Sequence, residues 1–262
     1  MNYIKFIVFN FCRARGIWIQ LSPTKNEIEL LLKKFKPKVI NKDLIRIGSD
    51  GDGGYIIPDD LGGISSCLSP GVDRTSDFED ELSQLEINSY LLDASVTRPP
   101  ISNPKFTFRK NFLGSFDSGE YISIETWLLD VKEKPDYILQ MDIEGYEYEV
   151  LESISKRNLL KFRILVIEFH CLEKILNPFF FDRLTKIMDI ILEHFVIAHT
   201  HMNNSDRLIK YKGENIPRTM EVSFIRKDRV KIEYGEPTLP NKLDKLNRPE
   251  LQSYPYPKCW KE

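Results

Sequence analysis

The sequence lacks the features by which several classes of protein are recognised. Its four cysteines, Cys12, Cys67, Cys171 and Cys259, lie far apart and form neither a C-x-x-C pair nor a dense disulfide framework. The formal net charge is only −2, and no basic stripe alternates with aromatic residues, so the chain has no electrostatic reason to bind nucleic acid. We therefore expect reduced thiols, a cytoplasmic protein and a small-molecule partner.

A long uninterrupted apolar run is also missing. The N-terminal stretch 4–21 is rich in Ile and Phe, but Lys5, Arg13 and Arg15 interrupt it, which makes it too short and too charged for a membrane span. It has no small-residue cleavage site, so we do not expect a signal peptide. We expect a helix that packs on the domain or on a second subunit of a homodimer. Peripheral association with a membrane surface is the alternative.

Strands alternate with helices along most of the chain. The 262 residues, of which 42% are hydrophobic, are enough for one large domain or two small ones. The alternation predicts an α/β fold in which a mostly parallel sheet carries helices on both faces. We expect an N-terminal helical segment over 1–43, the main domain over 44–230 and an extended, proline-rich arm over 231–262. The expected strands are 65–70, 90–93, 106–109, 138–141, 164–169, 195–199 and 221–226, and the expected helices are 23–38, 76–86 and 180–193.

The most informative stretch is P-D-Y-I-L-Q-M-D-I-E-G-Y-E-Y-E-V-L-E, residues 135–152. An apolar run ends abruptly at Asp142 and Glu144, Gly145 follows, and a helix opens near Glu147. Such a run predicts a strand that is buried on both faces of a parallel sheet. Open α/β sheets bind ligands outside the carboxyl ends of their strands. Asp142 and Glu144 are therefore expected at the rim of a ligand crevice.

The first expected strand leads into a glycine-containing loop and then into an acid-rich helix. Gly71 would let the backbone approach a ligand closely, although the full G-x-G-x-x-G motif is absent and a plain turn explains one glycine equally well. The acids at the start of the helix, Asp77, Glu79 and Asp80, would repel a phosphate, which favours a cationic or zwitterionic ligand over NAD. Asp93 ends the next strand, where a carboxylate can accept hydrogen bonds from a ribose diol.

Four segments make the chain resemble the FkbM-type family of S-adenosylmethionine-dependent methyltransferases. They are D-G-G-Y-I-I-P-D-D-L, L-S-P-G-V-D-R-T-S-D-F-E-D-E-L, Q-M-D-I-E-G-Y-E-Y-E-V-L and L-V-I-E-F-H. With H-T-H-M-N-N and M-E-V-S-F-I-R-K-D, the resemblance covers about residues 45–228. The chain has L-S-P-G-V-D-R-T where many members carry D-x-G-A-N-x-G. The resemblance implies the class I (Rossmann-like) methyltransferase fold, a seven-stranded sheet whose last strand is antiparallel. It also implies methyl transfer to an oxygen, commonly on a sugar or glycan precursor.

The resemblance also implies where the cofactor binds. S-adenosylmethionine would lie across the ends of the first four strands. Arg46, Asp52 and Tyr55, around the turn S-D-G-D-G-G-Y, are expected near the cofactor or the acceptor, on a flap rather than on a calcium loop. The expected cofactor contacts are Ser69, Gly71, Val72, Asp93, Asn111, Phe112 and Asp142.

A hydroxyl acceptor needs a base or a metal ion, and the candidates follow the fourth, fifth and sixth expected strands. We expect His170 to be the general base, because its unperturbed pKa lies near the operating pH. Asp142 and Glu144 are expected beside it, with His201 as the next candidate. Asp142, His170 and His201 would also suit a divalent cation as hard oxygen and nitrogen ligands, which we favour less.

Two other functions stay open at this point. The first is a methyltransferase of the same fold that acts on a non-sugar metabolite or an amine. The second is a non-catalytic Rossmann-like binding module. Carboxylates crowded at a crevice argue against such a module, because a scaffold gains nothing from them. The sequence does not decide between a free carbohydrate and a nucleotide-linked sugar as the acceptor.

Overall fold

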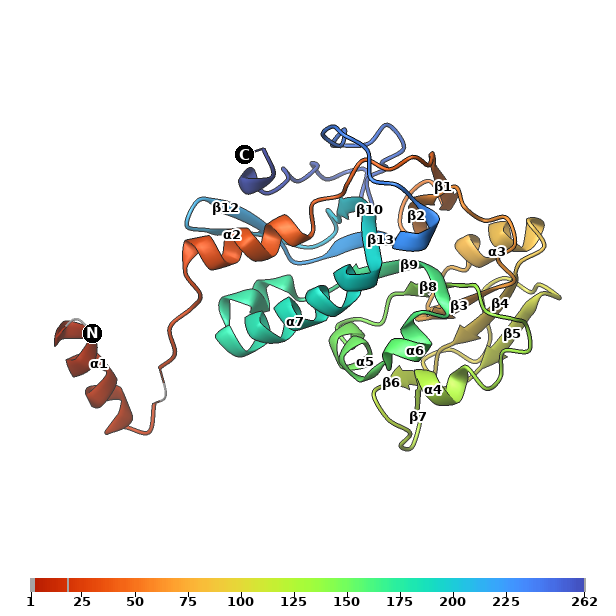
Figure 1. Ribbon diagram of the computed structural model, residues 1–262. Coiled ribbons are helices and arrows are strands. Elements are labelled where there is room, and N and C mark those ends of the chain that lie inside the picture. Colours follow the sequence, from red (N-terminus) through yellow and green to blue (C-terminus); the bar gives the residue numbers. More distant parts are fainter. Residues whose placement is uncertain (1–2, 18, 262) are drawn as a thin grey trace.

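A seven-stranded sheet runs through the middle of the protein (Figure 1). The computed structural model describes residues 3–17 and 19–261. The strands of this sheet are β3 (Ser66–Pro70), β4 (Asn88–Leu92), β5 (Phe106–Arg109), β8 (Tyr137–Met141), β9 (Phe162–Phe169), β10 (Phe195–Met202) and β13 (Met220–Arg226). Their spatial order is β10-β13-β9-β8-β3-β4-β5. All neighbouring strands are parallel except that β13 runs antiparallel to both β9 and β10. The predicted fold, with its last strand antiparallel, is confirmed.

Three two-stranded ribbons accompany the main sheet. The antiparallel ribbon of β1 (Leu44–Gly48) and β2 (Gly54–Pro58) contains the turn S-D-G-D-G-G-Y that was expected from the sequence. The other two were not expected from the sequence. They are a parallel pair of β6 (Phe112–Gly114) with β7 (Tyr121–Ser123), and an antiparallel pair of β11 (Leu208–Tyr211) with β12 (Glu214–Pro217).

Local sequence explains where the two longest helices of the domain begin. Helix α2 starts with a capping box, in which Thr24 and Glu27 satisfy each other's backbone N–H groups. Helix α7 starts after Asn177, whose side chain accepts a hydrogen bond from the N–H of Phe179, and its first residue is a proline. The α-helices are α1 (Tyr3–Arg13), α2 (Lys25–Lys34), α3 (Asp77–Gln84), α4 (Ile124–Trp127), α5 (Glu147–Ser153), α6 (Lys156–Leu159) and α7 (Pro178–His194), and the 3-10 helices are η1 (Leu172–Leu176), η2 (Lys227–Arg229) and η3 (Lys258–Trp260).

The two faces of the sheet are covered differently. Neighbouring residues of a strand point to opposite faces, so Leu139 packs in one cluster with residues of α2, α4, α5 and α7. Ile138 packs in another cluster on the opposite face, with residues of α3 and of the β1–β2 ribbon. Helices therefore lie on both faces, but on the second face the ribbon does much of the covering. Every residue of β8 is buried, which is why that strand reads as an unbroken apolar run.

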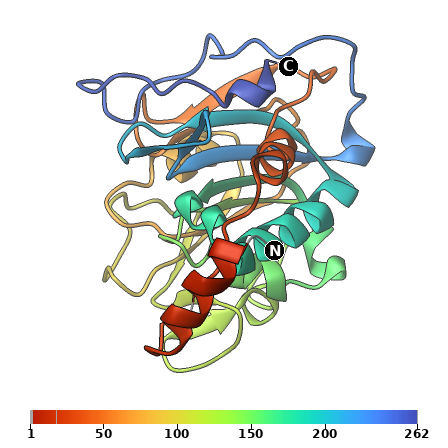
Figure 2. The same cartoon turned by 90° about the vertical axis from the view of Figure 1, so that its left-hand side faces the viewer.

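The C-terminal arm, residues 231–262, crosses the top of the domain in Figures 1 and 2 and ends at η3. Trp260 anchors its end, because the buried indole N–H donates a hydrogen bond of 2.7 Å to the carbonyl of Leu32 in α2. The middle of the arm is held by Asn204, whose side-chain amide donates to the carbonyl of Arg248 at 2.8 Å. The arm is thus fixed to both α2 and the segment that follows β10.

Helix α1 lies apart from the rest of the chain (Figure 1). Its apolar side chains Phe6, Ile7 and Phe11 are about half exposed or more. The sequence predicted that this helix packs either on the domain or on a second subunit. The structure does not show it packed on the domain. Among the described residues, no helix is both long enough and apolar enough to cross a membrane.

Candidate active site

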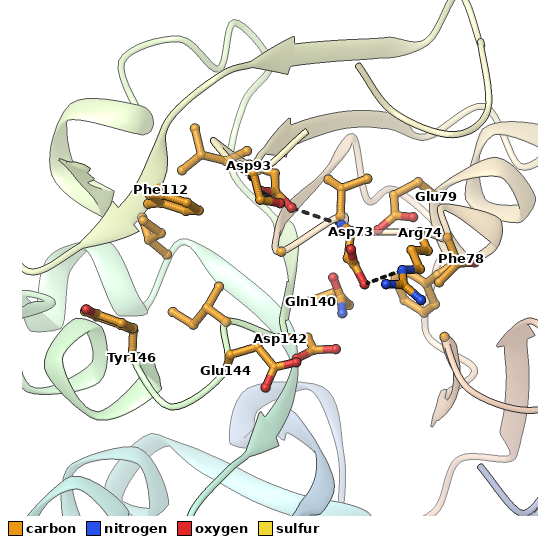
Figure 3. A pocket seen from close by; sticks show the side chains of 18 of the residues that line it. Asp73, Arg74, Phe78, Glu79, Asp93, Phe112, Gln140, Asp142, Glu144 and Tyr146 are labelled. Atoms are coloured by element: carbon orange, nitrogen blue, oxygen red, sulfur yellow. Dashed lines mark hydrogen bonds and ion pairs between the residues drawn. The ribbon is translucent and has the colours of Figure 1, made fainter. Parts of the chain in front are cut away.

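A cavity of 620 Å³ opens at the carboxyl ends of β3, β4 and β8. It lies where open α/β sheets bind their ligands. Figure 3 shows Phe112 and Tyr146 on one side of it, Phe78 and Arg74 on the other, and Asp142 beside Glu144 at the base. The β1–β2 turn contributes Asp52 and Gly53, and β2 contributes Tyr55. The remaining lining residues are Gly71, Val72, Asp73, Thr75, Asp77, Glu79, Leu92, Asp93, Ser95, Leu113, Tyr121, Gln140 and Ile143.

The loop after β3 touches the end of β8, and Gly71 makes this possible. Its φ is +90°, which side chains rarely adopt, and a Cβ at this position would lie 1.6 Å from the carbonyl oxygen of Asp142. A glycine is therefore required for close packing of the two loops as well as for the turn. This packing fixes the floor of the cavity between the first and fourth expected strands.

Asp93 organises the same loop from the end of β4. Its Oδ2 accepts a hydrogen bond of 2.9 Å from the N–H of Asp73. Its Oδ1 accepts one from the N–H and one from the hydroxyl of Ser95, both at 2.7 Å. The carboxylate therefore has one free lone pair on Oδ2 for a ligand, and it also holds the loop that follows Gly71.

The floor of the cavity is a chain of buried polar side chains. Ser69 Oγ lies within hydrogen-bonding distance of Glu79 Oε1 and, at 2.6 Å, of Gln140 Oε1. Burial raises the pKa of Glu79, which favours a protonated carboxyl that donates to Ser69, while Ser69 donates its single proton to Gln140. The amide of Gln140 donates in turn to the hydroxyl of Tyr55 at 3.2 Å.

The loop after β8 is folded tightly around one buried carboxylate. Glu144 and Gly145 both have positive φ, of 56° and 106°. Glu147 Oε1 accepts hydrogen bonds from the N–H groups of Ile143 at 3.2 Å and Gly145 at 3.1 Å. The same oxygen lies 2.9 Å from Nδ1 of His170. Glu147 is fully buried, so it links the loop that carries Asp142 and Glu144 to the end of β9.

His170 faces a group of three carboxylates with its other ring nitrogen. Nε2 lies 3.6 Å from Asp142 Oδ1, 3.7 Å from Glu144 Oε2 and 3.8 Å from Glu168 Oε1. Asp142 and Glu144 also line the cavity, whereas His170 and Glu168 lie behind them. Glu168 is held by Asn203, whose amide donates to its Oε1 at 2.7 Å.

These groups shift each other's pKa values. Burial raises the pKa of Asp142 to about 7, against the opposing effect of His170. Burial alone would lower the pKa of His170, but the hydrogen bond that His170 donates to Glu147 and the surrounding carboxylates outweigh it and raise that pKa to about 9. Burial and the neighbouring Asp142 and Glu221 raise the pKa of Glu168.

An aromatic wall borders the cavity opposite α3. The rings of Phe112 and Tyr121 have centroids 5.5 Å apart, and those of Tyr121 and Tyr146 are 5.7 Å apart. Phe112 was expected at the site from the sequence. Tyr121 and Tyr146 were not, because they come from the unpredicted strand β7 and from the turn before α5.

The structure brings most of the expected catalytic residues and cofactor contacts together, with three exceptions. Gly71, Val72, Asp93, Phe112, Asp142 and Glu144 line the cavity, and His170 touches its base. Ser69 lies beneath the floor, and Asn111 hydrogen-bonds to Arg109 and to the carbonyl of Glu120, so neither lines the cavity. Arg46 donates to the carbonyls of Ser49 and Gly51 and supports the β1–β2 turn from outside.

His201 is the third exception, and its expected position was wrong for two reasons. β10 continues to Met202, so His201 lies inside the strand rather than after it. β13 is inserted between β9 and β10, so the ends of the fifth and sixth expected strands are not adjacent. His201 instead contacts the C-terminal arm, with Nδ1 3.1 Å from Asp244 Oδ1 and Nε2 3.2 Å from Asn247 Oδ1. His199 Nε2 lies 3.0 Å from the same oxygen of Asp244.

The set of side chains that could hold a metal ion changes accordingly. Within the described part of the chain, Asp142, Glu168 and His170 offer ligand atoms that all lie within 4.8 Å of one another. Glu168, rather than His201, is thus the third candidate ligand. The signal for Glu168 was present in the motif I-E-F-H, two residues before His170, where alternation along a strand places both on one face.

The strand order, the antiparallel β13 and a cavity at the carboxyl ends of the strands are those of the class I methyltransferase fold. Residues 112–204 match the sequence model of the family described as "Methyltransferase FkbM domain". The resemblance predicted from the sequence is thereby confirmed over these residues, which supports a methyl-transferring enzyme. The matched segment includes Asp142, Glu144, Glu168 and His170.

Other comparisons add little. No curated protein matches the chain. One solved structure that it resembles is a mutant 16S rRNA (adenine(1408)-N(1))-methyltransferase from Catenulisporales acidiphilia. The identity is 10%, the TM-score is 0.30, and the match covers 62% of this chain and 85% of the other.

Proposed function

We propose that the protein is an S-adenosylmethionine-dependent O-methyltransferase that methylates a hydroxyl group of a sugar or glycan precursor. The observation that carries the cofactor is the charge of the cavity. Arg74 is the only basic side chain among the lining residues, and it is almost fully exposed. Seven lining residues have a carboxyl group, and six remain when the protonated Glu79 is left out, namely Asp52, Asp73, Asp77, Asp93, Asp142 and Glu144. Such a cavity favours a ligand with a sulfonium and an amino group over a dinucleotide with two phosphates.

The residues present fit this cofactor on two further counts. Gly71 lets the β3 loop pack against the backbone of Asp142, which brings the loops after β3 and β8 together at the floor of the cavity, where the ligand would lie. Asp93 retains one lone pair on Oδ2 at the end of β4, where a ribose hydroxyl would be bound. When bound, the cofactor supplies an electrophilic methyl carbon, whose bond to sulfur breaks as its bond to the acceptor oxygen forms, leaving a neutral thioether.

A sugar acceptor is supported by the aromatic wall. The rings of Phe112, Tyr121 and Tyr146 offer apolar faces on which the C–H face of a sugar ring can pack. Asp142 and Glu144 lie within the same cavity to accept hydrogen bonds from its hydroxyls. A free glycan hydroxyl suits this acidic surface better than the diphosphate of a nucleotide-linked sugar, which the carboxylates would repel.

The acceptor hydroxyl must lose a proton as the methyl group is transferred. We propose that Glu144, and not His170, is the base that accepts this proton. Glu144 lines the cavity and its side chain is 87% exposed, so it can pass the proton on to water. His170 lies behind Asp142 and Glu144, and its role is to position them. This differs from the expectation from the sequence, which could not show that His170 stands outside the cavity lining.

Incubation with S-adenosylmethionine and a panel of mono- and oligosaccharides tests this function. The expected result is formation of S-adenosylhomocysteine that depends on the sugar, together with a product heavier by one methylene group. Glu144→Gln should lower kcat by roughly 10²–10⁴. Glu149→Gln, a matched change on the exposed face of α5, should not. Turnover with amines or non-sugar metabolites but with no sugar would replace the proposed acceptor. Cofactor binding without turnover on any acceptor would favour a binding module.

A further inference from the structure

We propose that His170, Glu168 and Asp142 form a binding site for one divalent metal ion of the Mn²⁺ type, at the base of the cavity. The metal site itself is inferred from the geometry of these residues. Only its role toward the acceptor rests on the proposed function. The sequence favoured a metal-independent enzyme, because the family resemblance alone does not demand a metal. If a metal were bound, the expected ligands were Asp142, His170 and His201, and the structure removes His201 from the site.

The orientation of the His170 ring suits a metal ligand. Nδ1 faces two acceptors, Glu147 Oε1 at 2.9 Å and the carbonyl oxygen of Glu168 at 3.1 Å, so this nitrogen carries the hydrogen. The raised pKa of His170 keeps a second proton on Nε2 near neutral pH when no ion is bound. A metal ion would displace that proton, and Nε2 would then present its lone pair on the side of Asp142 and Glu168. A histidine that binds a metal ion almost always donates its other N–H to a carboxylate or a backbone carbonyl. His170 has both.

The distances from His170 Nε2 to the two carboxylate oxygens are close to those found around a bound ion. Nε2 lies 3.6 Å from Asp142 Oδ1 and 3.8 Å from Glu168 Oε1, which is too long for a hydrogen bond. Two ligand atoms that each lie about 2.1 Å from a common ion are separated by roughly 3.0–3.4 Å in octahedral or tetrahedral coordination. These two separations exceed the range by a few tenths of an ångström, and the three ligand atoms all lie within 4.8 Å of one another, so side-chain rotations would bring them to a common ion.

The Glu168 side chain and the backbone of Asp142 are also held in place. Asn203 donates to Glu168 Oε1, and Glu168 is 5% exposed, so its position is set by the fold. Asp142 follows directly after β8 and is fixed by the contact of its carbonyl with the β3 loop at Gly71. Glu144 Oε2, at 3.7 Å from Nε2, borders the same space but is 87% exposed. It is therefore left free to take the proton.

The chemistry of the ligands indicates the kind of ion. Two carboxylates and one imidazole form a mixed oxygen and nitrogen set without thiolates, which suits Mn²⁺ better than the soft ions bound by cysteine. Three protein ligands leave coordination positions open. Because Asp142 lines the cavity, an oxygen of the acceptor can take one of them. A bound cation would lower the pKa of that hydroxyl and orient it.

Titration of the full-length protein with Mn²⁺, without cofactor or acceptor, tests the site by electron paramagnetic resonance of the free ion. The account predicts one bound ion per chain. Glu168→Gln should weaken binding by about tenfold or more, and Glu147→Gln, which removes the charge behind His170, by about 10–100-fold. Glu214→Gln is the matched control, because Glu214 is as buried as Glu168 but accepts a hydrogen bond from the N–H of Lys258 in the C-terminal arm and lies outside the set. Its affinity for Mn²⁺ should stay within about threefold of wild type.

A second measurement needs no variant and so does not depend on the folding of any mutant. In histidine-selective NMR of the wild-type protein, substoichiometric Mn²⁺ should broaden the His170 ring signal most strongly and that of His194, which lies directly before the start of β10, least. No saturable binding up to about 1 mM Mn²⁺, equal losses in Glu168→Gln and Glu214→Gln, or equal broadening of the His170 and His194 signals would overturn the proposal. Titration of the same sample with S-adenosylhomocysteine reports on the proposed function separately, because either ligand can bind without the other.

Discussion

Nδ1 of His170 lies 2.9 Å from Oε1 of Glu147, and this contact ties the loop after β8 to the end of β9. The same oxygen accepts the N–H groups of Ile143 and Gly145, so one buried carboxylate sets both the shape of the loop and the direction of the imidazole. Asp142 and Glu144 reach the cavity because of this arrangement. Glu147 touches neither the cavity nor the acceptor, and it acts as a positioning residue.

Glu147→Gln should therefore lower kcat more than it affects cofactor binding. The amide keeps the size of the side chain but removes the charge behind His170, and losses of this kind reduce activity by about 10–100-fold. The dissociation constant of S-adenosylhomocysteine should stay within a few-fold of wild type, since the residue lies away from Asp93. Glu149→Gln, two positions along α5 and partly exposed, is the control. Equal losses in kcat and in cofactor affinity would mean that Glu147 only maintains the fold.

Asp93 should control cofactor affinity. Asp93→Ala loses the bond to the N–H of Asp73 and the free lone pair of Oδ2, which together contribute roughly 1.5–3 kcal/mol. The affinity for S-adenosylhomocysteine should fall by about tenfold to a hundredfold in a calorimetric titration. Ser95→Ala removes one hydrogen bond to Asp93 Oδ1 but leaves Oδ2 in place, so its effect should be much smaller. An unchanged affinity in Asp93→Ala would show that the ribose is bound elsewhere.

Gly71→Ala should reduce both stability and cofactor binding. The added Cβ would lie 1.6 Å from the carbonyl oxygen of Asp142, at a backbone φ of +90°. Strain of this kind costs about 1–3 kcal/mol, and the clash adds to it. Gly62→Ala is the matched control, because its Cβ would meet nothing within 4 Å and its φ is not positive. Thermal unfolding should show a lower Tm for Gly71→Ala only. Similar Tm values for both variants would contradict the described contact between the loops.

The contact of the C-terminal arm with β10 should make stability depend on pH. Burial opposes ionisation of Asp244, but hydrogen bonds with His199 and His201 outweigh it and lower its pKa. Burial likewise opposes the charged form of His201, yet Asp244 and Glu221 raise its pKa. Asp244 therefore contributes stability above about pH 3.9 that is lost as the pH falls through its lowered pKa. His201 contributes stability below about pH 6.5 that is lost as the pH rises through its raised pKa.

Denaturant unfolding as a function of pH measures this contribution. Asp244→Asn should cost roughly 1.5–3 kcal/mol between about pH 4 and 6.5 and less at higher pH, where His201 becomes neutral in the folded state. Asp189→Asn, a change in an exposed ion pair with Lys34, should cost less than about 1 kcal/mol at any pH. If the loss of unfolding free energy in Asp244→Asn became larger above pH 7, the proposed contribution of His201 would be contradicted.

The sequence predicted the fold well because its signals are local. Runs such as 138–141 and 164–169 are buried on both faces and read as strands from composition alone. Asp142, Glu144 and Asp93 could be placed at the rim of a crevice because parallel strands end on the same edge of the sheet. Gly71 was found as a turn residue, although its contact with Asp142 was not visible.

The errors at the site all concern neighbours across the sheet. Nothing in the run 195–204 shows that β13 enters between β9 and β10, so His201 was placed beside His170 when Glu221 lies next to Glu168. The partner of His201, Asp244, comes from the C-terminal arm, forty-three residues away in sequence. In the sequence alone, Glu147 looks like an ordinary acidic residue in the first turn of a helix. Its role behind His170 depends on a fold that brings α5 against the end of β9.

Calorimetric titration of the wild-type protein with S-adenosylhomocysteine tests the central claim most directly. The account predicts saturable binding of one equivalent with a dissociation constant of about 1–100 µM, weakened in Asp93→Ala and unaffected by Glu149→Gln. Absence of saturable heat up to about 1 mM ligand, with protein that is folded by circular dichroism, would contradict the assignment of the acidic cavity to this cofactor.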